Sequence, residues 1–135
     1  MKSGNTKGLE QYVELASYDD KFLSIEEEKK ALEKAISELG FESVDDAKKL
    51  VEAFCRKNQI VNERLLDEKI SNLLKGACSD GSISKTEFDS IFNEMKPVSN
   101  LNENRLKSKM KALIMENSFK VKEGVFFGAK WFSNM

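Results

Sequence analysis

Histidine is absent from this chain, and proline occurs only once, at Pro97. The absence of histidine removes the commonest general base, the Ser-His and Cys-His nucleophile pairs, and His-ligated zinc. We therefore expect a protein that is not an enzyme, and the enzyme class left open is a hydrolase with a two-metal carboxylate site. The single proline and the 7 glycines among 135 residues favour helices over a turn-rich β architecture.

Long apolar runs and a disulfide framework are also missing. No apolar run approaches the ~20 residues needed to span a bilayer, and the polar residues 1–6 lack the apolar core of a secretory signal. The 2 cysteines, Cys55 and Cys78, are too few for a disulfide framework and lie in helical apolar patterns. These features predict a cytoplasmic protein with reduced thiols and no transmembrane segment.

Charge is divided unevenly along the chain. Residues 1–95 carry 14 basic and 20 acidic side chains, whereas residues 96–135 carry 8 basic and 3 acidic ones. This division argues against nucleic-acid binding, because phosphate recognition needs one broad basic face. The basic side chains of the helix expected at residues 102–117 either meet an acidic membrane surface peripherally or snorkel around a core stripe. They are Arg105, Lys107, Lys109 and Lys111.

A helix–loop–helix pattern occurs twice, with the same order and spacing. In the first helix and its loop, the matching residues are Leu9, Tyr12, Val13, Ala16 and Asp19 in one copy and Ile70, Leu73, Leu74, Ala77 and Asp80 in the other. In the next helix they are Ser24, Glu27, Ala31, Leu32 and Ala35 and then Ser84, Glu87, Ile91, Phe92 and Met95. The second copy is one residue shorter, in its loop. Each copy thus places an aspartate after one helix and a glutamate in the first turn of the next.

Apolar residues at helical spacing predict six helices, or seven if the C-terminal segment adds one. The first helix is expected at residues 9–18 and the sixth at residues 102–117. Capping boxes at residues 24–27 and 84–87 open the second and fifth helices, because a serine and a glutamate at this spacing satisfy each other's backbone amides. Pro97 is expected to end the fifth helix.

The expected fold class is all-α, a six- or seven-helix bundle built from two related helix–loop–helix halves. We expect a flexible N-terminus at residues 1–8 and one helical domain at residues 9–117. An aromatic C-terminal segment at residues 118–135 is expected to pack on the bundle. Ile36 and Val44 are expected on the faces of their helices that point into the core.

The second loop resembles the latter half of an EF-hand calcium loop. Asp80, Gly81 and Glu87 fall at loop positions 5, 6 and 12. Positions 1 and 3 also require oxygen ligands, but Gly76 and Cys78 stand there. Two side-chain ligands are therefore missing, and a degenerate EF-hand is a minor alternative.

Two stretches resemble the signature of TerB-like domains, a small helical family named for tellurite resistance. Residues 77–87, Ala-Cys-Ser-Asp-Gly-Ser-Ile-Ser-Lys-Thr-Glu, resemble its Ala-Asp-Gly stretch, small polar helix start and glutamate, and residues 16–27 resemble the partner copy. Ser79 and Tyr18 stand where the signature has alanine. The resemblance covers residues 8–117. It implies an all-α bundle that acts in stress responses as a metal-linked or scaffold protein, beside membrane-associated partners.

The resemblance also implies a shared acidic cluster that binds a divalent cation, Ca²⁺, Mg²⁺, Mn²⁺ or Zn²⁺. Four carboxylates that converge repel one another unless a cation or a shifted pKa relieves them. The alternative is structural: the aspartates accept from turn amides, and the glutamates complete capping boxes that each contribute roughly 0.5–2 kcal/mol. The candidate residues are Asp19, Asp20, Glu27, Asp80 and Glu87.

Aromatic side chains concentrate near the C-terminus and form the candidate partner-binding site. Large aromatic residues are costly to expose, and tryptophan is enriched at the centres of protein interfaces. The alternative is that they cover the open end of the bundle. The residues are Phe126, Phe127, Trp131 and Phe132.

The sequence as a whole predicts a non-enzymatic binding or scaffold protein that resembles TerB-like stress-response domains. The competing hypothesis is a small acidic inhibitor or immunity-type protein. Such a protein binds the basic surface of its partner without metal, and its binding weakens steeply with salt.

Overall fold

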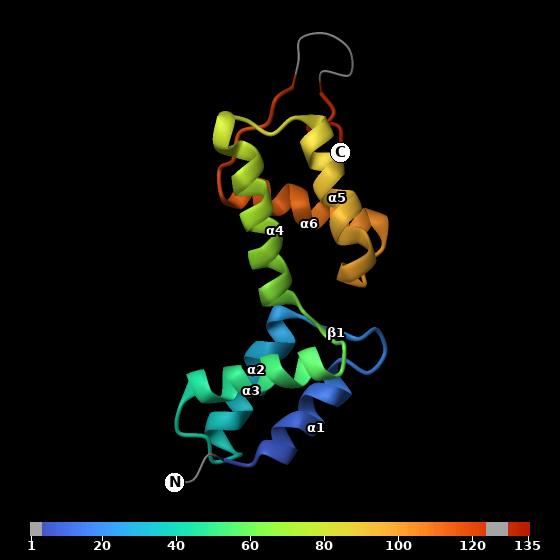
Figure 1. Ribbon diagram of the computed structural model, residues 1–135. Helices are drawn as coiled ribbons and strands as arrows, with labels where there is room; N and C mark the ends of the chain where they lie inside the picture. The colour runs from blue at the N-terminus through green and yellow to red at the C-terminus, as the bar shows by residue number, and fades with distance from the viewer. Residues whose placement is uncertain (1–3, 124–129) are drawn as a thin grey trace. The chain divides into compact units, whose positions relative to one another are not determined.

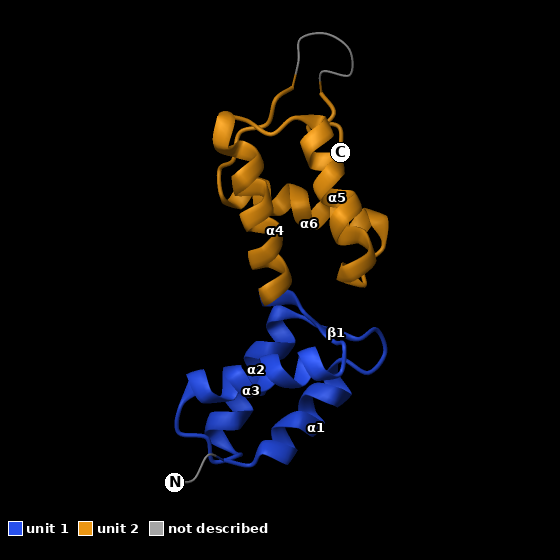
Figure 2. Cartoon of the chain, viewed as in Figure 1, with its two compact units in different colours: residues 1–64 blue, residues 65–135 orange. Residues whose placement is uncertain are grey.

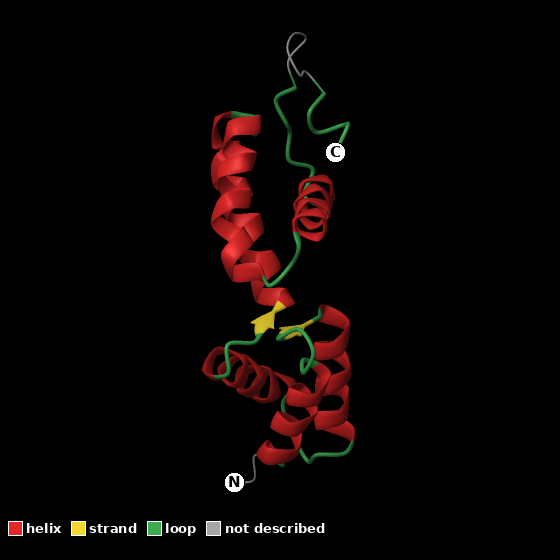
Figure 3. Cartoon of the chain, turned by 90° about the vertical axis from the view of Figure 1, so that its right-hand side faces the viewer, coloured by secondary structure: helices red, strands yellow, loops and turns green. Residues whose placement is uncertain are grey.

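The computed structural model describes residues 4–123 and 130–135 and is mostly helical (Figure 1). Its six described α-helices are α1 (Thr6–Ala16), α2 (Ile25–Ser37), α3 (Val44–Lys57), α4 (Glu63–Ala77), α5 (Lys85–Ser99) and α6 (Glu103–Glu116). Between them lie two short strands, β1 (Phe22–Leu23) and β2 (Val61–Asn62), and a 3₁₀ turn, η1 (Cys78–Asp80) (Figure 3). The predicted all-α fold is confirmed.

Helix α1 begins three residues before the expected start at Leu9. The reason is a cap that the apolar periodicity does not reveal: the side-chain oxygen of Asn5 accepts a hydrogen bond from the Gly8 amide at 2.9 Å. The backbone amide of Asn5 also donates to the Leu39 carbonyl at 2.7 Å, which ties the start of α1 to the segment after α2.

The prediction that Pro97 ends the fifth helix is wrong, because α5 continues through Pro97 to Ser99. A proline inside a helix removes one backbone hydrogen bond. Here that loss falls in the last turn, where Ser99 and the following Leu101 are both buried. The helix ends instead at Asn100, whose left-handed conformation, with φ of 59°, turns the chain.

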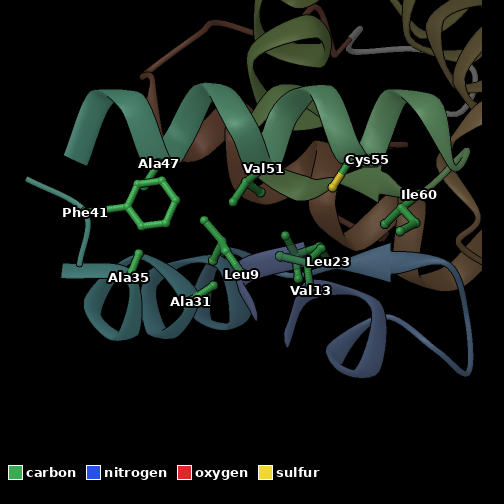
Figure 4. Close-up of a cluster of buried hydrophobic side chains, with 10 residues drawn as sticks. All are labelled: Leu9, Val13, Leu23, Ala31, Ala35, Phe41, Ala47, Val51, Cys55 and Ile60. Atoms are coloured by element: carbon green, nitrogen blue, oxygen red, sulfur yellow. The ribbon is translucent and has the colours of Figure 1, made fainter. Parts of the chain in front are cut away.

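The chain divides into two compact units, residues 1–64 (unit 1) and residues 65–135 (unit 2) (Figure 2). In unit 1 the helices α1, α2 and α3 pack against one another. Strands β1 and β2 pair in parallel, with Leu23 opposite Asn62. Figure 4 shows the side chains of α3 facing those of α1 and α2 across the core of unit 1. This core contains Leu9, Val13, Leu23, Ala31, Ala35, Phe41, Ala47, Val51, Cys55 and Ile60.

Unit 2 has its own buried apolar core and its own parallel pairing. The Ile83 amide donates to the Lys120 carbonyl at 2.8 Å, and the Lys122 amide donates to the Ile83 carbonyl at 2.7 Å, so Ile83 pairs with Val121. The most deeply buried apolar residues are Ile70, Leu74, Ile83, Phe88, Met95, Leu106, Met110 and Ile114.

The internal repeat is larger than the predicted helix–loop–helix. Helices α3 and α6 both contain 14 residues and both end on an asparagine cap, Asn58 or Asn117. The next residue is left-handed in each copy, with φ of 59° at Gln59 and 57° at Ser118. A strand residue that pairs with the first loop follows in each copy. The repeated element is therefore three helices with a parallel strand pairing.

Candidate functional site

The glutamates of both predicted acidic loops complete capping boxes. In the first copy, Oε1 of Glu27 accepts from the Ser24 amide at 2.9 Å, and the Glu27 amide donates to the Ser24 hydroxyl at 3.0 Å. The second copy repeats this with Glu87 and Ser84, at 2.8 and 3.1 Å. Each glutamate thus stabilises the first turn of its helix.

The aspartates lie in the turns before these caps. Oδ1 of Asp20 accepts from the Phe22 amide at 3.2 Å, and Oδ1 of Asp80 lies 3.5 Å from the Ser82 amide. Asp19 is exposed. Within residues 4–123 and 130–135, no three cysteine, aspartate or glutamate side chains are grouped closely enough to hold a metal ion. No observation among the described residues supports the divalent-cation site, which stays a prediction.

Helix α4 also bears on the EF-hand alternative. It continues through Ala77, so Gly76, at the first position of the proposed calcium loop, is helical. Cys78, at the third position, lies in the 3₁₀ turn η1. A calcium loop needs its early positions free to place oxygen atoms around the ion. The loop between α4 and α5 is therefore shorter than the twelve-residue calcium loop of an EF-hand.

An open groove lies on unit 1 and is lined by α2, the start of α3 and the first turn of α4. Its volume is about 640 Å³. Three large aliphatic side chains along it are well exposed: Ile25 at 47%, Ile36 at 41% and Val44 at 48%. We call it the α2–α3 groove; its lining residues are Ile25, Glu28, Lys29, Leu32, Glu33, Ile36, Val44, Lys48 and Arg64. The expectation that Ile36 and Val44 face the core is wrong.

Helix α2 has two apolar faces, and this explains that error. Ala31 and Ala35 are completely buried in the core of unit 1. Leu32 directly follows Ala31, and Ile36 directly follows Ala35. Leu32 and Ile36 therefore lie on the adjacent face of the helix. That adjacent face lines the groove. A wide apolar face was therefore visible in the sequence, but periodicity could not show how much of it the neighbouring helices would cover.

A network of charged and polar side chains lies at one end of the groove. Arg64 donates to both carboxylate oxygens of Glu28, at 2.8 and 3.0 Å, and to Glu52 at 2.7 Å. The amide of Asn62 donates to Glu28 at 2.8 Å. Glu28 is only 4% exposed. A buried carboxylate is tolerated where such donors compensate it, and the bidentate contact fixes the guanidinium plane.

The network shifts the ionisation of its members. Burial alone raises the pKa of Glu28, but the hydrogen bonds from Arg64 and Asn62 outweigh it, so its pKa lies below the ordinary value. Glu28 therefore stays ionised. Burial also raises the pKa of the neighbouring Cys55 thiol to about 11, and the charge of Glu28 adds to this effect. Cys55 is accordingly a protonated core side chain rather than a nucleophile.

The rim of the groove carries charges of both signs. Lys29, Lys48 and Glu33 lie along it, and in the described part of the chain none of the three forms an ion pair. Arg64 faces two carboxylates, Glu28 and Glu52. The positive charges of Arg64, Lys29 and Lys48 are thus matched in number by the negative charges of Glu28, Glu52 and Glu33.

The C-terminal residues fold onto unit 2. The ring of Trp131 packs against Phe88, with centroids 5.3 Å apart, and its Nε1 donates to the Lys122 carbonyl at 3.0 Å. Phe132 packs edge-on against Trp131 at 5.7 Å. For these two residues the structure shows packing on unit 2. The other two predicted partner-binding residues, Phe126 and Phe127, lie outside the described residues.

Glu123 and Lys111 hold this C-terminal turn in place. The carboxylate of Glu123 accepts from the amides of Phe132 and Ser133, at 3.0 and 2.8 Å, which lowers the pKa of Glu123. The ammonium of Lys111 lies 5.3 Å from the centre of the Phe132 ring. The turn therefore has both polar and apolar contacts with unit 2.

The basic side chains of α6 have specific contacts within unit 2. Lys109 forms an ion pair with Asp67 at 2.9 Å, and Lys107 lies 5.3 Å from the centre of the Phe92 ring. Arg105 is exposed. These contacts favour the interpretation that the lysines surround the core stripe. Among the described residues, the helices are all too short or too polar to cross a membrane.

Comparison with known proteins adds no family. No protein-family model, no curated protein and no solved structure matches this chain. The functional argument therefore depends on the geometry of the two units, and above all on the α2–α3 groove.

Proposed function

We propose that this chain is a non-enzymatic binding protein and that the α2–α3 groove of unit 1 binds an apolar segment of a protein partner. The observation that carries the proposal is the exposure of Ile25, Ile36 and Val44 around one groove. A contiguous apolar surface costs solubility and usually marks a binding site, and apolar grooves with a few charged groups are typical ligand sites.

The rigidity of the groove supports this proposal. Glu28, Arg64 and Glu52 are joined by short charge-assisted hydrogen bonds, and Oε1 of Glu63 accepts from the Ile25 amide at 2.8 Å. These contacts connect the starts of α2 and α4 with the middle of α3. A preformed groove binds more tightly because less conformational freedom is lost on binding.

The resemblance to TerB-like domains suggests a role for such binding, in a stress-response scaffold of the cytoplasm or at the surface of a membrane. The inhibitor or immunity-type hypothesis remains the alternative. It places binding on acidic surface residues, so partner capture would weaken steeply with salt and would not depend on the groove.

Selection from a random peptide library tests the proposal. The full chain and an Ile36→Lys/Val44→Lys variant are used as parallel baits. Both changes are at exposed positions, so we expect the variant to keep the wild-type helical content and to unfold within about 0.5 kcal/mol of it. A matched control, Leu15→Lys/Met115→Lys, alters two other exposed apolar residues, at 76% and 64% exposure.

We expect peptides that bind the wild type and the control but not the groove variant. Peptides that bind all three baits equally would refute the groove as the binding site. Failure to enrich any peptide on the wild type would refute it as well.

A further inference from the structure

The exposed aliphatic residues of the α2–α3 groove have no apolar counterparts in unit 2. Helices α2 and α5 both begin directly after a capping-box serine, and helices α3 and α6 both contain 14 residues. Positions in the two copies can therefore be matched by counting from the helix starts. The matching residues of unit 2 are all charged: Ile25 corresponds to Lys85, Ile36 to Lys96 and Val44 to Glu103.

Helix α5 shows how such positions are filled when they face solvent. Lys85 and Asp89 form an ion pair at 2.7 Å, and their side chains are 60% and 49% exposed. The repeated three-helix fold therefore does not require apolar side chains at these positions. A contiguous apolar surface is unfavourable in water, so the exposed Ile25 and Ile36 of unit 1 indicate a surface that another molecule covers.

The exposed side of α2 has the spacing of a seam between two helices. Ile25, Lys29, Leu32 and Ile36 follow one another at intervals of four, three and four residues. This is the spacing of the a and d positions in helices that pack along their length. All four residues line the groove. The occupant that matches this spacing is itself a helix with apolar side chains at the same intervals.

The seam of α2 is complementary to itself when the direction of the helix is reversed. Around a two-fold axis at the level of Ala31, Ile25 of one copy lies opposite Ile36 of the other, and Lys29 lies opposite Glu33. Each contact then occurs twice, because the axis exchanges the two copies. A parallel arrangement would instead place the two copies of Lys29 opposite each other, and likewise the two copies of Glu33. Both of these contacts are repulsive.

The charges around the groove agree with such an occupant. Positive and negative groups are equal in number there, so the groove does not select a strongly acidic or strongly basic segment. Within the described ranges of the chain, Lys29 and Glu33 form no ion pair. Both side chains can therefore pair with a second copy without breaking a contact inside the first.

We propose that the groove binds a second copy of this chain, with α2 of each copy lying antiparallel along the α2–α3 groove of the other. This inference rests on the proposed binding function of the groove and names its partner. The exposed aliphatic side chains of both copies are buried together. Two ion pairs between Lys29 and Glu33 fix the direction, as a lysine within a helix seam specifies register at a cost in stability. One helix and one groove of each copy form a small interface, so we expect a dimer that dissociates on dilution.

Sedimentation velocity of the full chain between about 1 μM and about 1 mM tests for this dimer. We expect the mass to rise with concentration from 15.3 kDa toward twice that value. The Ile36→Lys/Val44→Lys variant should stay monomeric, whereas the control Leu15→Lys/Met115→Lys should dimerise like the wild type. A wild type that is monomeric at every concentration would overturn the proposal. A dimer that the groove variant retains would overturn it as well.

Charge reversal tests the antiparallel direction. Lys29→Glu and Glu33→Lys each place like charges opposite each other and should raise the dimer Kd at least about tenfold. Mixing the two variants, or combining both changes in one chain, should restore dimerisation, because each lysine again faces a glutamate. Lys29→Gln replaces Lys29→Glu if circular dichroism shows that the reversed variant folds poorly.

Lys30→Glu is the matched control for charge reversal, because Lys30 is exposed on the same helix and does not line the groove. This control should keep the wild-type Kd. Equal Kd values for the wild type and for both single reversals at Lys29 and Glu33 would contradict the antiparallel arrangement.

The outcomes separate this inference from the proposed function. Peptides selected on the groove should dissociate the dimer, because peptide and second copy occupy the same surface. A monomeric protein that still selects groove-dependent peptides would overturn the second copy as the occupant and would leave the proposed function supported. A monomeric protein that selects no peptide would overturn both.

Discussion

Units 1 and 2 share one plan of three helices and a strand pairing, but their cores are filled differently. Equivalent buried positions hold small side chains in unit 1 and large ones in unit 2: Ala31, Ala35, Ala47 and Cys55 against Ile91, Met95, Leu106 and Ile114. Small side chains let helices approach closely but bury less apolar area, at roughly 25 cal/mol per Å². Unit 1 therefore depends more on its polar network, and unit 2 on apolar packing.

The surfaces of the two units show the same difference between polar contacts in unit 1 and apolar contacts in unit 2. Unit 1 places the ion pair of Glu28 and Arg64 where unit 2 places Phe88 and Trp131. Unit 2 covers its apolar surface with its own chain, whereas unit 1 leaves an apolar groove open. The two copies of one fold thus differ in how much apolar surface they leave exposed to solvent.

Replacing Arg64 by methionine should have the largest effect on this comparison. The substitution leaves Glu28 buried without its cation and should lower the free energy of unfolding by about 3 kcal/mol, the lower end for a broken buried pair because Arg64 is partly exposed. Urea unfolding followed by circular dichroism measures the loss. Arg56→Met removes the same charge from an exposed position of α3 and should cost less than about 0.5 kcal/mol. Equal losses in both variants would contradict the role assigned to the network.

Replacing Trp131 by alanine should be the next largest change, at about 2 kcal/mol. It removes the ring contact with Phe88 and the hydrogen bond to Lys122. Hydrogen exchange of unit 2 amides, together with thermal unfolding, measures the effect. Phe132→Leu keeps an apolar side chain and serves as a milder control. If Trp131→Ala leaves stability unchanged, the C-terminal turn does not contribute to the folding of unit 2.

The lowered pKa of Glu28 predicts a pH dependence of stability that Glu28→Gln removes. Because the pKa of Glu28 in the folded state lies below its ordinary value, ionised Glu28 stabilises the fold above that ordinary value, and this stabilisation is lost as the pH falls through the folded-state pKa. Glu28→Gln lacks this titration. It should cost about 1.5 kcal/mol at pH 7, and less at pH 3. Urea midpoints of both proteins at the two pH values measure the difference. A constant difference would show that the stabilisation does not come from the ionised carboxylate.

The capping boxes should behave alike in the two units, whatever fills their cores. Ser24→Ala and Ser84→Ala each remove one side-chain acceptor from a helix start and should each cost about 1 kcal/mol. Ser37→Ala, at an exposed position near the end of α2, is the control. Thermal unfolding of the three variants provides the measurement. A large effect of only one serine would mean that the two boxes are not equivalent.

Divalent cations should produce the smallest effect. Glu27 and Glu87 already accept hydrogen bonds from backbone amides, so we expect Ca²⁺, Mg²⁺, Mn²⁺ and Zn²⁺ to leave the Tm of chelator-treated protein unchanged. A cation that binds the folded state adds up to ~2.7 kcal/mol at a hundredfold excess over its Kd. A rise in Tm that disappears in Asp80→Asn/Glu87→Gln would establish the metal site that the TerB-like resemblance implies.

Local features of the fold were predictable from the sequence because they depend on residues close together in the chain. The capping boxes at Ser24 and Ser84 follow from a spacing of three residues, and the structure confirms both. The first half of the repeat was also visible. The match between α3 and α6 was not, because Ala47 and Leu106 differ in size even though both are buried.

The groove was harder to predict, because burial depends on which helices meet. Ile36 and Val44 have the periodicity of core residues, yet both are exposed. The contact of Arg64 with Glu28 joins residues far apart in sequence, and no local pattern pairs them. The sequence signal that could have indicated an exposed apolar surface is the width of the apolar face of α2, where Leu32 and Ile36 follow Ala31 and Ala35.

The position of the junction between the repeats affects whether recombination can separate them. Domain boundaries usually fall in flexible linkers, where segments can be exchanged. Here the boundary falls inside helix α4, in which Arg64 belongs to unit 1 and the buried Leu66 and Ile70 belong to unit 2. Recombination at this point would interrupt a helix on which both copies depend. The duplicated halves are therefore expected to be passed on together, as one indivisible gene segment.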